Sequence, residues 1–595
     1  MCGIFGYVGK RTDAEKIVFE GIKSLEYRGY DSWGIVAKQE PRSGNLESGK
    51  LIAEKHAGKI GDARLSVVDR PSSIALGHTR WATHGGVLQK NAHPHFDCEG
   101  KIAVVHNGII ENFQELKASL TQKHKFKSQT DTEVVVHLVE ELAIKYKLEE
   151  AIRRAFLRVR GLNAFIFLPE DGEIVAIKSG SPLVIGVGRG ENFLASDPSA
   201  LLPYTKDVIY VKDGEMVRIL ANKVTISRAK SKEIVKSEIS RLDWSQKVAN
   251  KGKYKHFFLK EVYEQPQILG NISNEQRALV SRFTNELKRG EGIFLVACGS
   301  AANSALAGVY LFSKVAKKHL NFAFGSEFKY LEDYISSKSL VLAISQSGES
   351  VDVIEPVISA KKRGAQILSI VNTEGSTLWR TSKLNFPLKV GPEKAVVATK
   401  SYIAMVGVIM LLAFSSAGRG VYARKLLRLA ANSIDRILEK SYLEKVKNLA
   451  KLLAQSDHAY MIGRGISYAS ALEAALKLKE TAYIHAEGFA GGELKHGVIA
   501  LVERGTPCIV FAPNDETYDD VISNAIEIKS RGGYIIGVSP ENNDAFDFHL
   551  QVADCREASI IANTVPVQLL AYFMALEKGL DPDMPRNLAK SVTVK

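Results

Sequence analysis

The chain opens with Met1-Cys2-Gly3-Ile4-Phe5-Gly6-Tyr7-Val8, and the interpretation of the first domain depends on this stretch. If the initiator methionine is removed, Cys2 becomes the first residue and carries a thiol and an α-amine together. Such an amine has a pKa of about 7.7–8, so part of it can accept a proton near neutrality. A terminal amine is one of the bases that activate a nucleophile. The alternative is structural, with Cys2 a small residue that opens a buried strand.

Composition and charge indicate a large globular protein that binds small molecules. A length of 595 residues predicts about three domains, and 45% hydrophobic with 24% charged residues is typical of soluble proteins. The net charge of +13 is spread along the chain without long basic blocks. Because no nucleic-acid recognition motif accompanies the charge, we expect no nucleic-acid partner, whereas an anionic small substrate fits.

The cysteines and apolar runs indicate a cytoplasmic protein. The five cysteines, Cys2, Cys98, Cys298, Cys508 and Cys555, show no paired spacing, which predicts a reducing compartment. The start has no signal-peptide pattern. The longest apolar run, Ile403 to Phe414, is too short to cross a bilayer, so we expect a buried helix and no membrane association.

The first 240 residues favour short strands that present polar clusters. Strands are expected at 101–105, 163–168 and 207–211, and a helix at 132–147 with Asp131 as its cap. The polar clusters lie at His78–Gly85, His106–Gly108 and Gln129–Glu133.

The residue types in these clusters suit the binding of an amino acid and catalysis at its amide. An arginine can hold a carboxylate by two parallel hydrogen bonds, and an asparagine amide beside a glycine N–H suits an oxyanion. Asp131 suits an ammonium group. The alternative for each cluster is structural, since Asn-Gly is a common turn and Thr-Asp a common helix start.

Together with Cys2, these clusters resemble the N-terminal-nucleophile glutamine amidotransferase domain. The resemblance implies an α+β fold, a four-layer sandwich of sheets and helices. It implies that Cys2 attacks the side-chain amide of glutamine and that Asn107 and Gly108 form the oxyanion hole. The glutamine-binding residues implied are Arg80, Trp81, Thr83, His84 and Asp131, with Trp81 gating the exit of ammonia.

A metal site was the alternative for the group His93, His95, Asp97 and Cys98. The group has no standard ligand spacing, and the family resembled uses no metal here. We therefore expect no metal and no cofactor.

A polar stretch at 241–252 with few apolar anchors predicts a linker between the two halves. A helix is expected from Tyr254, which Pro266 stops or follows. The predicted domains are 1–240, 253–430 and 431–585, followed by a tail at 586–595.

The second half contains an internal repeat. The strand and glycine turn at Gly292–Gly299 recur at Asp457–Gly465, and the turn at 362–365 recurs at 530–533 with nearly the same offset. Alternating strands and helices predict two α/β domains with parallel, doubly wound sheets. The alternative, a dinucleotide fingerprint at Gly463-Arg464-Gly465, lacks the third glycine.

A candidate phosphate loop, Ser345-Gln346-Ser347-Gly348-Glu349-Ser350, lies between an apolar strand and a helix expected from Val351. Backbone N–H groups and hydroxyls at such a point form an anion site, although a plain helix cap is the alternative. These repeats resemble sugar isomerase (SIS) domains. The sugar-phosphate-binding residues implied are Ser300, Ser345, Gln346, Ser347, Ser350, Val396 and Arg586.

Candidate catalytic groups lie on a helix in the second copy and in the tail. Glu473, Lys477 and Glu480 share one helix face by their spacing. The alternatives are a solvated ion-pair stripe for this face and a frayed, inactive end for the tail.

Nearly the whole chain resembles the glutamine–fructose-6-phosphate aminotransferases. The resemblance implies that ammonia from glutamine is passed internally to fructose 6-phosphate, giving glucosamine 6-phosphate and glutamate. It implies a Schiff base on Lys590, proton transfer between C1 and C2 by Glu480, support from Lys477, and ring opening by His496 of a neighbouring subunit. A homodimer or a larger homo-oligomer follows from the last point.

The departures from the family leave the sugar specificity open. Ser300 and Ala301 stand where threonine and serine are common, and Ala398 stands where serine is common. The rival interpretations are an amidotransferase or deaminase acting on another amino-sugar phosphate, and a non-catalytic sugar-phosphate sensor. Lys595, where the family tends to have glutamate, has no interpretation.

Overall fold

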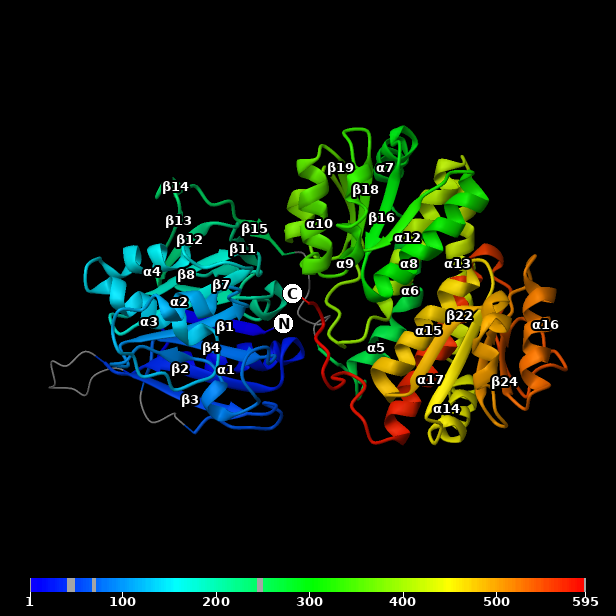
Figure 1. The fold of residues 1–595 in the computed structure, drawn as a ribbon, viewed down its shortest axis with the longest axis horizontal. Coiled ribbons are helices and arrows are strands. Elements are labelled where there is room, and N and C mark those ends of the chain that lie inside the picture. The colour runs from blue at the N-terminus through cyan, green and yellow to red at the C-terminus, as the bar shows by residue number, and fades with distance from the viewer. Residues whose placement is uncertain (1, 40–48, 67–70, 243–249, 593–595) are drawn as a thin grey trace. The chain divides into compact units, whose positions relative to one another are not determined.

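The computed structural model describes residues 2–39, 49–66, 71–242 and 250–592. They form two compact units (Figure 1), which divide between Asn250 and Lys251; Glu349–Val351 and the tail from Ala589 group with the amino-terminal unit. Within the predicted linker 241–252, residues 243–249 lie outside the described residues. The predicted domain limits stay predictions, and residue 430 lies inside helix α13 (Gly420–Ile437).

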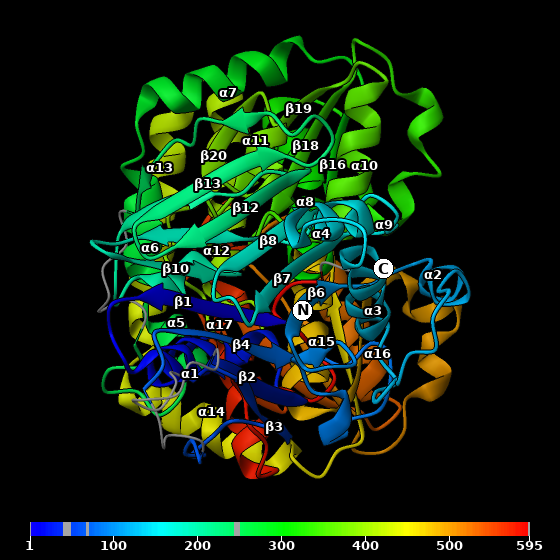
Figure 2. The same ribbon diagram turned by 90° about the vertical axis from the view of Figure 1, so that its left-hand side faces the viewer.

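The amino-terminal unit contains two antiparallel sheets (Figure 2). The eight-stranded sheet has the order β15 (Ser240–Arg241), β11 (Asp207–Tyr210), β9 (Val184–Val187), β10 (Glu191–Ala195), β1 (Gly3–Gly9), β4 (Ile74–Arg80), β2 (Ser32–Lys38) and β3 (Leu51–Ala57). The seven-stranded sheet has the order β14 (Ile234–Val235), β13 (Lys223–Arg228), β12 (Glu215–Leu220), β8 (Ile174–Ser179), β7 (Asn163–Pro169), β6 (Ile102–Gly108) and β5 (His95–Phe96).

Side chains on the two faces of β1 pack into two different cores of this unit. Phe5 and Tyr7 pack on one face in a core shared with helix α1 (Ala14–Ser24), whereas Ile4 and Val8 point to the core between the two sheets. The far face of the second sheet is covered by α2 (Phe113–Ala118), α3 (Thr132–Ala143) and α4 (Leu148–Phe156). The order is helix, sheet, sheet, helix, which confirms the predicted four-layer sandwich.

Two local predictions in this unit are partly confirmed. Helix α3 begins at Thr132 with Asp131 at its N-cap position, but it ends at Ala143, and Asp131 Oδ2 accepts the Ile110 N–H at 2.8 Å in place of a side-chain cap bond. The strand expected at 101–105 extends through Gly108 in pairing with β7, which excludes the alternative of a turn at Asn107-Gly108.

The carboxy-terminal unit contains two five-stranded parallel sheets with the same strand order. The first is β17 (Asn321–Phe324), β16 (Ile293–Ala297), β18 (Leu340–Ser345), β19 (Gln366–Val371) and β20 (Leu384–Pro387). The second is β22 (His485–Ala490), β21 (His458–Gly463), β23 (Pro507–Phe511), β24 (Tyr534–Ser539) and β25 (Phe548–Gln551). The shared order confirms the repeat of doubly wound domains predicted from the sequence.

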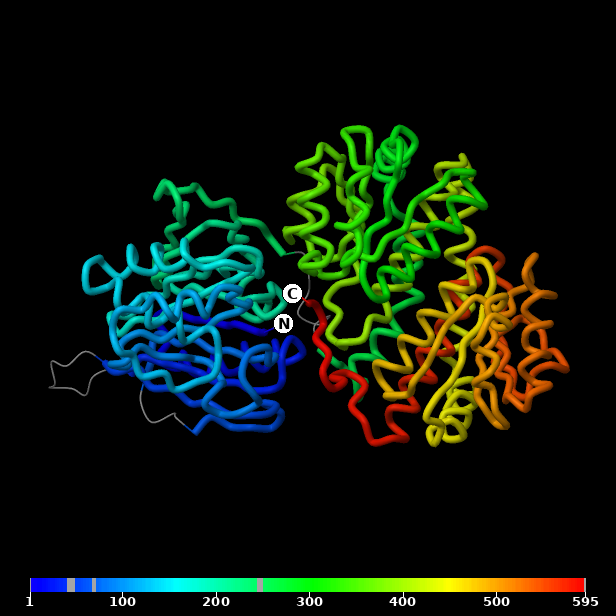
Figure 3. The backbone as a smooth tube through the Cα atoms, in the orientation of Figure 1, coloured from blue at the N-terminus to red at the C-terminus, as the bar shows by residue number. Residues whose placement is uncertain are grey.

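Helices connect and cover these sheets: α5 (Phe257–Tyr263), α6 (Gln265–Ser273), α7 (Arg277–Arg289), α8 (Gly299–Leu311), α9 (Gly325–Phe328), α10 (Val351–Lys362), α11 (Thr377–Thr381), α12 (Lys400–Ser416), α13, α14 (Lys440–Leu453), α15 (Ser467–Ala482), α16 (Tyr518–Lys529) and α17 (Ser559–Glu577). Pro266 does not end the helix before it, because it occupies the first turn of α6, where a missing N–H is tolerated. After α17 the backbone continues as a non-helical tail (Figure 3).

Two helices of this unit are apolar on all sides. The predicted buried helix at 403–414 is confirmed as part of α12, and α17 contributes to the same core. The segment Arg556–Glu577 is long and apolar enough to cross a membrane by composition, but 89% of its apolar window is buried within the protein. Such burial is that of a core helix.

Four buried histidines lie together in the amino-terminal unit: His78 on β4, His93, His95, and His106 on β6. The rings of His78 and His93 stack with centroids 4.1 Å apart, and those of His93 and His95 meet edge-on at 4.6 Å. Burial lowers the pKa of His78 to about 3 and holds the pKa values of the other three below their usual range. All four rings are therefore neutral at pH 7.

We predict that these histidines make the amino-terminal unit sensitive to acid. The unfolded chain binds protons on them below a pH of about 6.5, whereas the folded unit does not, so stability is present above that pH and is lost as the pH falls. Each histidine contributes about 1.4 kcal/mol per pH unit well below 6.5. Hydrogen exchange, corrected for intrinsic rates, should show the opening free energy of β4 and β6 falling between pH 7.5 and 5.5 more steeply than that of β16 and β21. Equal slopes would contradict the prediction.

Candidate active sites

Cys2 lies at the head of β1, where pairing with β4 fixes its surroundings. Gly3 is in register with Thr79 and donates its N–H to the Thr79 hydroxyl at 3.1 Å. The Cys2 Sγ accepts the Trp81 N–H at 3.3 Å. A side chain at residue 3 would place a Cβ 2.5 Å from Thr79 Oγ1, so this approach of the two strands requires glycine.

The backbone carbonyl of Cys2 is held from two sides. Asn107 Nδ2 donates to it at 3.0 Å and Arg28 Nε at 3.4 Å. The buried Arg28 is neutralised by Asp197, with Nη1 and Oδ2 2.9 Å apart. The sequence analysis missed this pair, although the polar stretch Tyr27-Arg28-Gly29-Tyr30-Asp31 between apolar segments was a signal for it.

His78 sets the direction of the Asn107 amide. Its Nε2 lies 2.9 Å from the His106 carbonyl oxygen and 3.2 Å from Asn107 Oδ1. Both partners are acceptors, so the neutral ring carries its proton on Nε2. The amide oxygen is thereby turned to His78 and the NH2 group to Cys2, which makes His78 a positioning residue that the sequence analysis did not single out.

Gly108 supplies a second N–H beside Asn107 on β6. Its φ of +142° is rarely adopted by other residues, and a Cβ here would lie 2.4 Å from the Leu162 carbonyl oxygen. This position therefore requires glycine.

Arg80 holds the loop that follows β4. The side chain is 3% exposed, and its Nη atoms donate to the carbonyls of His84, Gly85 and Gly86. A guanidinium has five N–H donors, so three loop contacts leave capacity for a carboxylate. Burial lowers the pKa of Arg80, and the Cys2 thiol and Asp131 act against that shift, so both lie in its electrostatic range.

The other residues predicted to bind glutamine surround this point. Asp131 is buried at the start of α3, Trp81 contributes its backbone to the Cys2 thiol, Thr83 is exposed, and the His84 ring packs edge-on against Phe113 at 5.3 Å. The structure thus brings Cys2, Arg80, Trp81, Asn107 and Asp131 together, with Thr83 and His84 on the adjoining loop.

The Cys2 thiol is not activated by its surroundings alone. Burial raises its pKa above the usual value, although the Trp81 N–H and Arg80 oppose that shift. The thiol is therefore protonated at neutral pH, and a nucleophilic role requires a base beside it.

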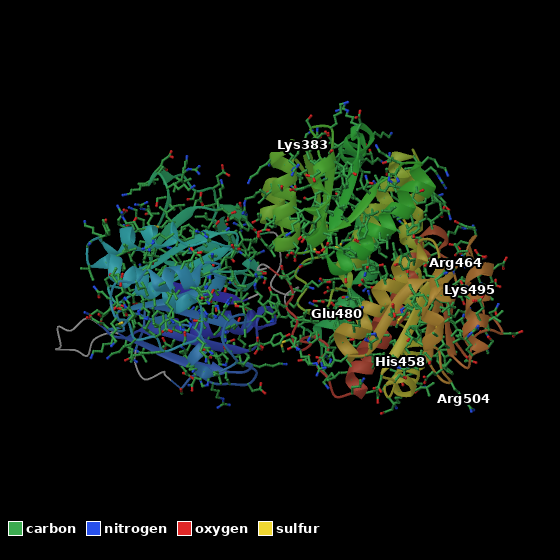
Figure 4. The ribbon with its side chains drawn as sticks, in the orientation of Figure 1. Lys383, His458, Arg464, Glu480, Lys495 and Arg504 are labelled. Atoms are coloured by element: carbon green, nitrogen blue, oxygen red, sulfur yellow. The ribbon has the colours of Figure 1, made fainter. Side chains whose placement is uncertain are left out.

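In the carboxy-terminal unit, Lys477 on α15 is the centre of a buried polar cluster. Its Nζ lies 2.6 Å from Glu480 Oε2, 3.0 Å from Ser300 Oγ on α8, and 3.3 Å from Glu473 Oε1. Asn303, also on α8, donates to Glu473 Oε2 at 2.8 Å. Glu480 is in the last turn of α15 (Figure 4).

The interpretation of this face as a solvated stripe is wrong, because the side chains of Glu473 and Lys477 are fully buried and that of Glu480 is 20% exposed. Burial by itself would lower the pKa of Lys477, but Glu473 and Glu480 outweigh it and raise the pKa, so the ammonium stays charged. A carboxylate held by a fixed cation, with one side open to solvent, is suited to proton transfer.

The predicted phosphate loop follows β18 at the carboxyl edge of the first parallel sheet. Gly348 has a φ of +67° and donates its N–H to Ser345 Oγ at 2.9 Å. A Cβ at residue 348 would lie 2.1 Å from Ser376 Oγ, so the tight turn requires glycine. The Gln346 carbonyl accepts the Asn372 N–H at 3.3 Å, and Ser347 follows in the same turn. Ser345 therefore shapes the loop with its acceptor oxygen and keeps its O–H to donate.

Three further residues predicted for the sugar half have surroundings of their own. Val396 is bound through its backbone N–H to the Asp583 carbonyl at 2.9 Å, and the Arg586 guanidinium lies 4.3 Å from the Tyr483 ring centroid. His496 is exposed at the end of the short helix Gly491–His496. Within residues 251–348 and 352–588, the hydrogen bonds made by Lys477 reach none of these three.

Ser350 and Lys590 group with the amino-terminal unit. The tail is anchored two residues beyond Lys590, where the Val592 carbonyl accepts the Val351 N–H at 2.9 Å. Lys595 lies outside the described residues.

Comparison with known families agrees with the two kinds of fold. Residues 54–255 match the glutamine amidotransferase domain, and residues 286–415 and 452–578 each match the SIS domain. The C-terminal domain of glucosamine-fructose-6-phosphate aminotransferase from Francisella tularensis superposes with a TM-score of 0.52 at 30% identity, covering 56% of this chain and 100% of that structure.

Relatives are similar over the full length of this chain. The glutamine–fructose-6-phosphate aminotransferase (isomerizing) of Thermococcus kodakarensis is 42% identical, and that of Pyrococcus horikoshii 41% identical; each match covers 100% of both chains. The chain therefore belongs to the glutamine–fructose-6-phosphate aminotransferase (isomerizing) family.

Proposed function

We propose that this chain converts fructose 6-phosphate and glutamine to glucosamine 6-phosphate and glutamate. The observation that carries the proposal is the hydrogen bond from the Asn107 amide, near the end of β6, to the backbone carbonyl of Cys2 at the start of β1, in a chain matched throughout by relatives named for this reaction.

In the glutamine half, the Cys2 thiolate attacks the side-chain amide carbon after its proton passes to the α-amine of the same residue. The amide oxygen becomes an oxyanion, which the second hydrogen of Asn107 Nδ2 and the Gly108 N–H stabilise. Ammonia leaves with the transferred proton, and water hydrolyses the thioester to glutamate. Arg80 binds the substrate carboxylate and Asp131 its ammonium group, with Trp81, Thr83 and His84 around them.

In the sugar half, the Lys590 amine condenses with the C2 ketone of the open-chain sugar and expels water. Ammonia then replaces the lysine nitrogen at C2, and Glu480 moves a proton from C1 to C2 to give the aldose. Lys477 donates a hydrogen bond to Glu480 at 2.6 Å and holds that carboxylate in place. The loop Ser345–Ser350, with Ser300, Val396 and Arg586, is assigned to the sugar phosphate.

His496 is assigned to ring opening in a neighbouring subunit, since it is exposed at the end of its short helix. This assignment requires a homodimer or a larger homo-oligomer. A cytoplasmic location and the domain limits 1–240, 253–430, 431–585 and 586–595 belong to the same proposal.

A rival amidotransferase or deaminase would differ from the proposed enzyme in the sugar phosphate on which it acts. Ser300 Oγ accepts a hydrogen bond from Lys477 Nζ at 3.0 Å, and the neighbouring residue Ala301 has no hydroxyl. Product analysis by mass spectrometry over a panel of ketose phosphates, with glutamine present, separates the proposed reaction from amination of another sugar. A sensor would bind the sugar phosphates without turnover.

Replacing the nucleophile should separate the two half-reactions. We expect Cys2→Ala to lose glutamine hydrolysis by a factor of at least about 10³, because no thioester can form, while isomerisation of fructose 6-phosphate stays within about two-fold of wild type. Cys555→Ala, which removes a thiol from the other unit, is the matched control and should leave glutamine hydrolysis intact. Glutamine-dependent product formation by Cys2→Ala would refute the role of Cys2.

The Schiff base can be trapped chemically. Borohydride added with fructose 6-phosphate should reduce the imine to a stable secondary amine, and peptide mass spectrometry should locate the adduct on Lys590. Lys590→Arg keeps the charge but forms no imine, so it should give no adduct. Label found on Lys477 or another lysine in the wild type would overturn the assignment.

A further inference from the structure

A cluster of four metal-ligand side chains lies in the amino-terminal unit, outside the site around Cys2. Cys98 comes from the connection between β5 and β6, His124 from the segment before α3, and His137 and Glu140 from one face of α3. Their ligand atoms all lie within 4.8 Å of one another. We propose that these four residues bind a zinc ion that joins the segment 97–124 to α3.

The separations within the cluster are those of a tetrahedral site. Cys98 Sγ lies 3.4 Å from His124 Nδ1 and 3.7 Å from His137 Nδ1, while Glu140 Oε2 lies 3.0 Å and 2.9 Å from the same two nitrogens. Zinc bonds of 2.0–2.3 Å at tetrahedral angles place neighbouring ligand atoms about 3.3–3.6 Å apart. These four pairs therefore need changes of only about 0.2–0.5 Å to bind zinc, and all the ligand atoms lie within 4.8 Å of one another.

The outer nitrogen of the His124 ring is held by a carboxylate, and that of the His137 ring faces one at a distance too long for a hydrogen bond. His124 Nε2 lies 3.1 Å from Glu141 Oε1, and His137 Nε2 lies 3.8 Å from Glu133 Oε1. In metal sites a ligating histidine commonly donates its other N–H to a carboxylate, which aims the lone pair of the first nitrogen at the metal. All three groups on α3 that face the rings, Glu133, Glu140 and Glu141, take part in this arrangement.

Because the cluster is buried, an arrangement of these side chains without a metal is hard to satisfy. The side chains of His124 and His137 are 2% and 0% exposed; His124 has a carboxylate at each ring nitrogen, whereas His137 Nε2 makes no hydrogen bond within the described residues. Without a metal, the Nδ1 atoms of both rings converge on one carboxylate oxygen, Glu140 Oε2, with the ring centroids 4.6 Å apart. A zinc ion instead takes the two Nδ1 lone pairs, the thiolate and the carboxylate, and its charge balances the two anions.

The four ligand atoms indicate which metal binds and that its role is structural. One sulfur, two imidazole nitrogens and one carboxylate oxygen favour zinc over magnesium or calcium, and four protein ligands form a closed, structural site. The site stands apart from the group considered from the sequence, of which it contains only Cys98. His93 and His95 belong to the buried histidine cluster, and Asp97 Oδ1 accepts the Ile102 N–H at 2.9 Å.

Metal content of the purified full-length chain tests the proposal. After growth with zinc and removal of loosely bound metal, mass spectrometry of the elements should find about one zinc per chain in the wild type and under about a tenth in His137→Ala. His319→Ala removes an exposed histidine of the other unit and should keep the full content. Glu141→Gln, outside the ligand set, should weaken zinc binding about 10-fold to 100-fold.

Cobalt provides a second readout that does not depend on a variant folding. Zinc-free wild type titrated with cobalt should develop the strong visible bands of tetrahedral cobalt and a near-ultraviolet sulfur-to-cobalt band. Cys98→Ser should lose the sulfur band, while Cys2→Ala should keep it. A wild type that holds no zinc and gives no tetrahedral cobalt spectrum would overturn the proposal, and a sulfur band that survives Cys98→Ser would overturn it as well.

Discussion

The pairing of β1 with β4 is the constraint on which the site around Cys2 depends. A strand that begins at residue 3 and is buried on both faces cannot slide by one residue without exchanging the side chains of its two cores. That register puts Cys2 beside Trp81 and within reach of Asn107 on the second sheet. The Cys2 thiol is thus fixed by the packing of the strand that follows it.

The site around Cys2 is built from neutral and paired groups. His78 is buried and uncharged and orients the Asn107 amide. Arg28 forms an ion pair with Asp197, and Arg80 donates hydrogen bonds to loop carbonyls. Leaving a buried polar group without a partner costs about 1–3 kcal/mol, so such networks resist rearrangement. In the other unit, Lys477 on α15 holds Glu480 by a hydrogen bond and donates a second one to Ser300 on α8.

The repeated strand-glycine units in the sequence were enough to predict the doubly wound sheets of the second half, because strands buried on both faces alternate with helices there. The four-layer sandwich of the first half was predicted only from the resemblance carried by Cys2 and the polar clusters. The expected structural roles of single residues were predicted less well than the fold class. Asp131 was expected to cap α3, but the Ile110 N–H competes for its carboxylate, and Pro266 begins a helix because its position in the first turn needs no donor.

Contacts between residues distant in sequence account for what was missed. Arg28 and Asp197, or Cys98 and His137, are brought together by sheet and helix packing, and no spacing rule connects them. The burial of Lys477 was missed for a similar reason, since a charged helix face looks solvated until a second helix is known to cover it. Ser345 was expected to bind phosphate, whereas its oxygen first closes the loop through Gly348.

The central claim is that nitrogen released at Cys2 reaches the sugar without mixing with solvent. The most direct measurement is to supply glutamine labelled with nitrogen-15 in its side-chain amide, together with fructose 6-phosphate and excess unlabelled ammonium. The account predicts that the amino-sugar product keeps nearly all of the label at every ammonium concentration. Label that falls in proportion to the added ammonium would contradict it.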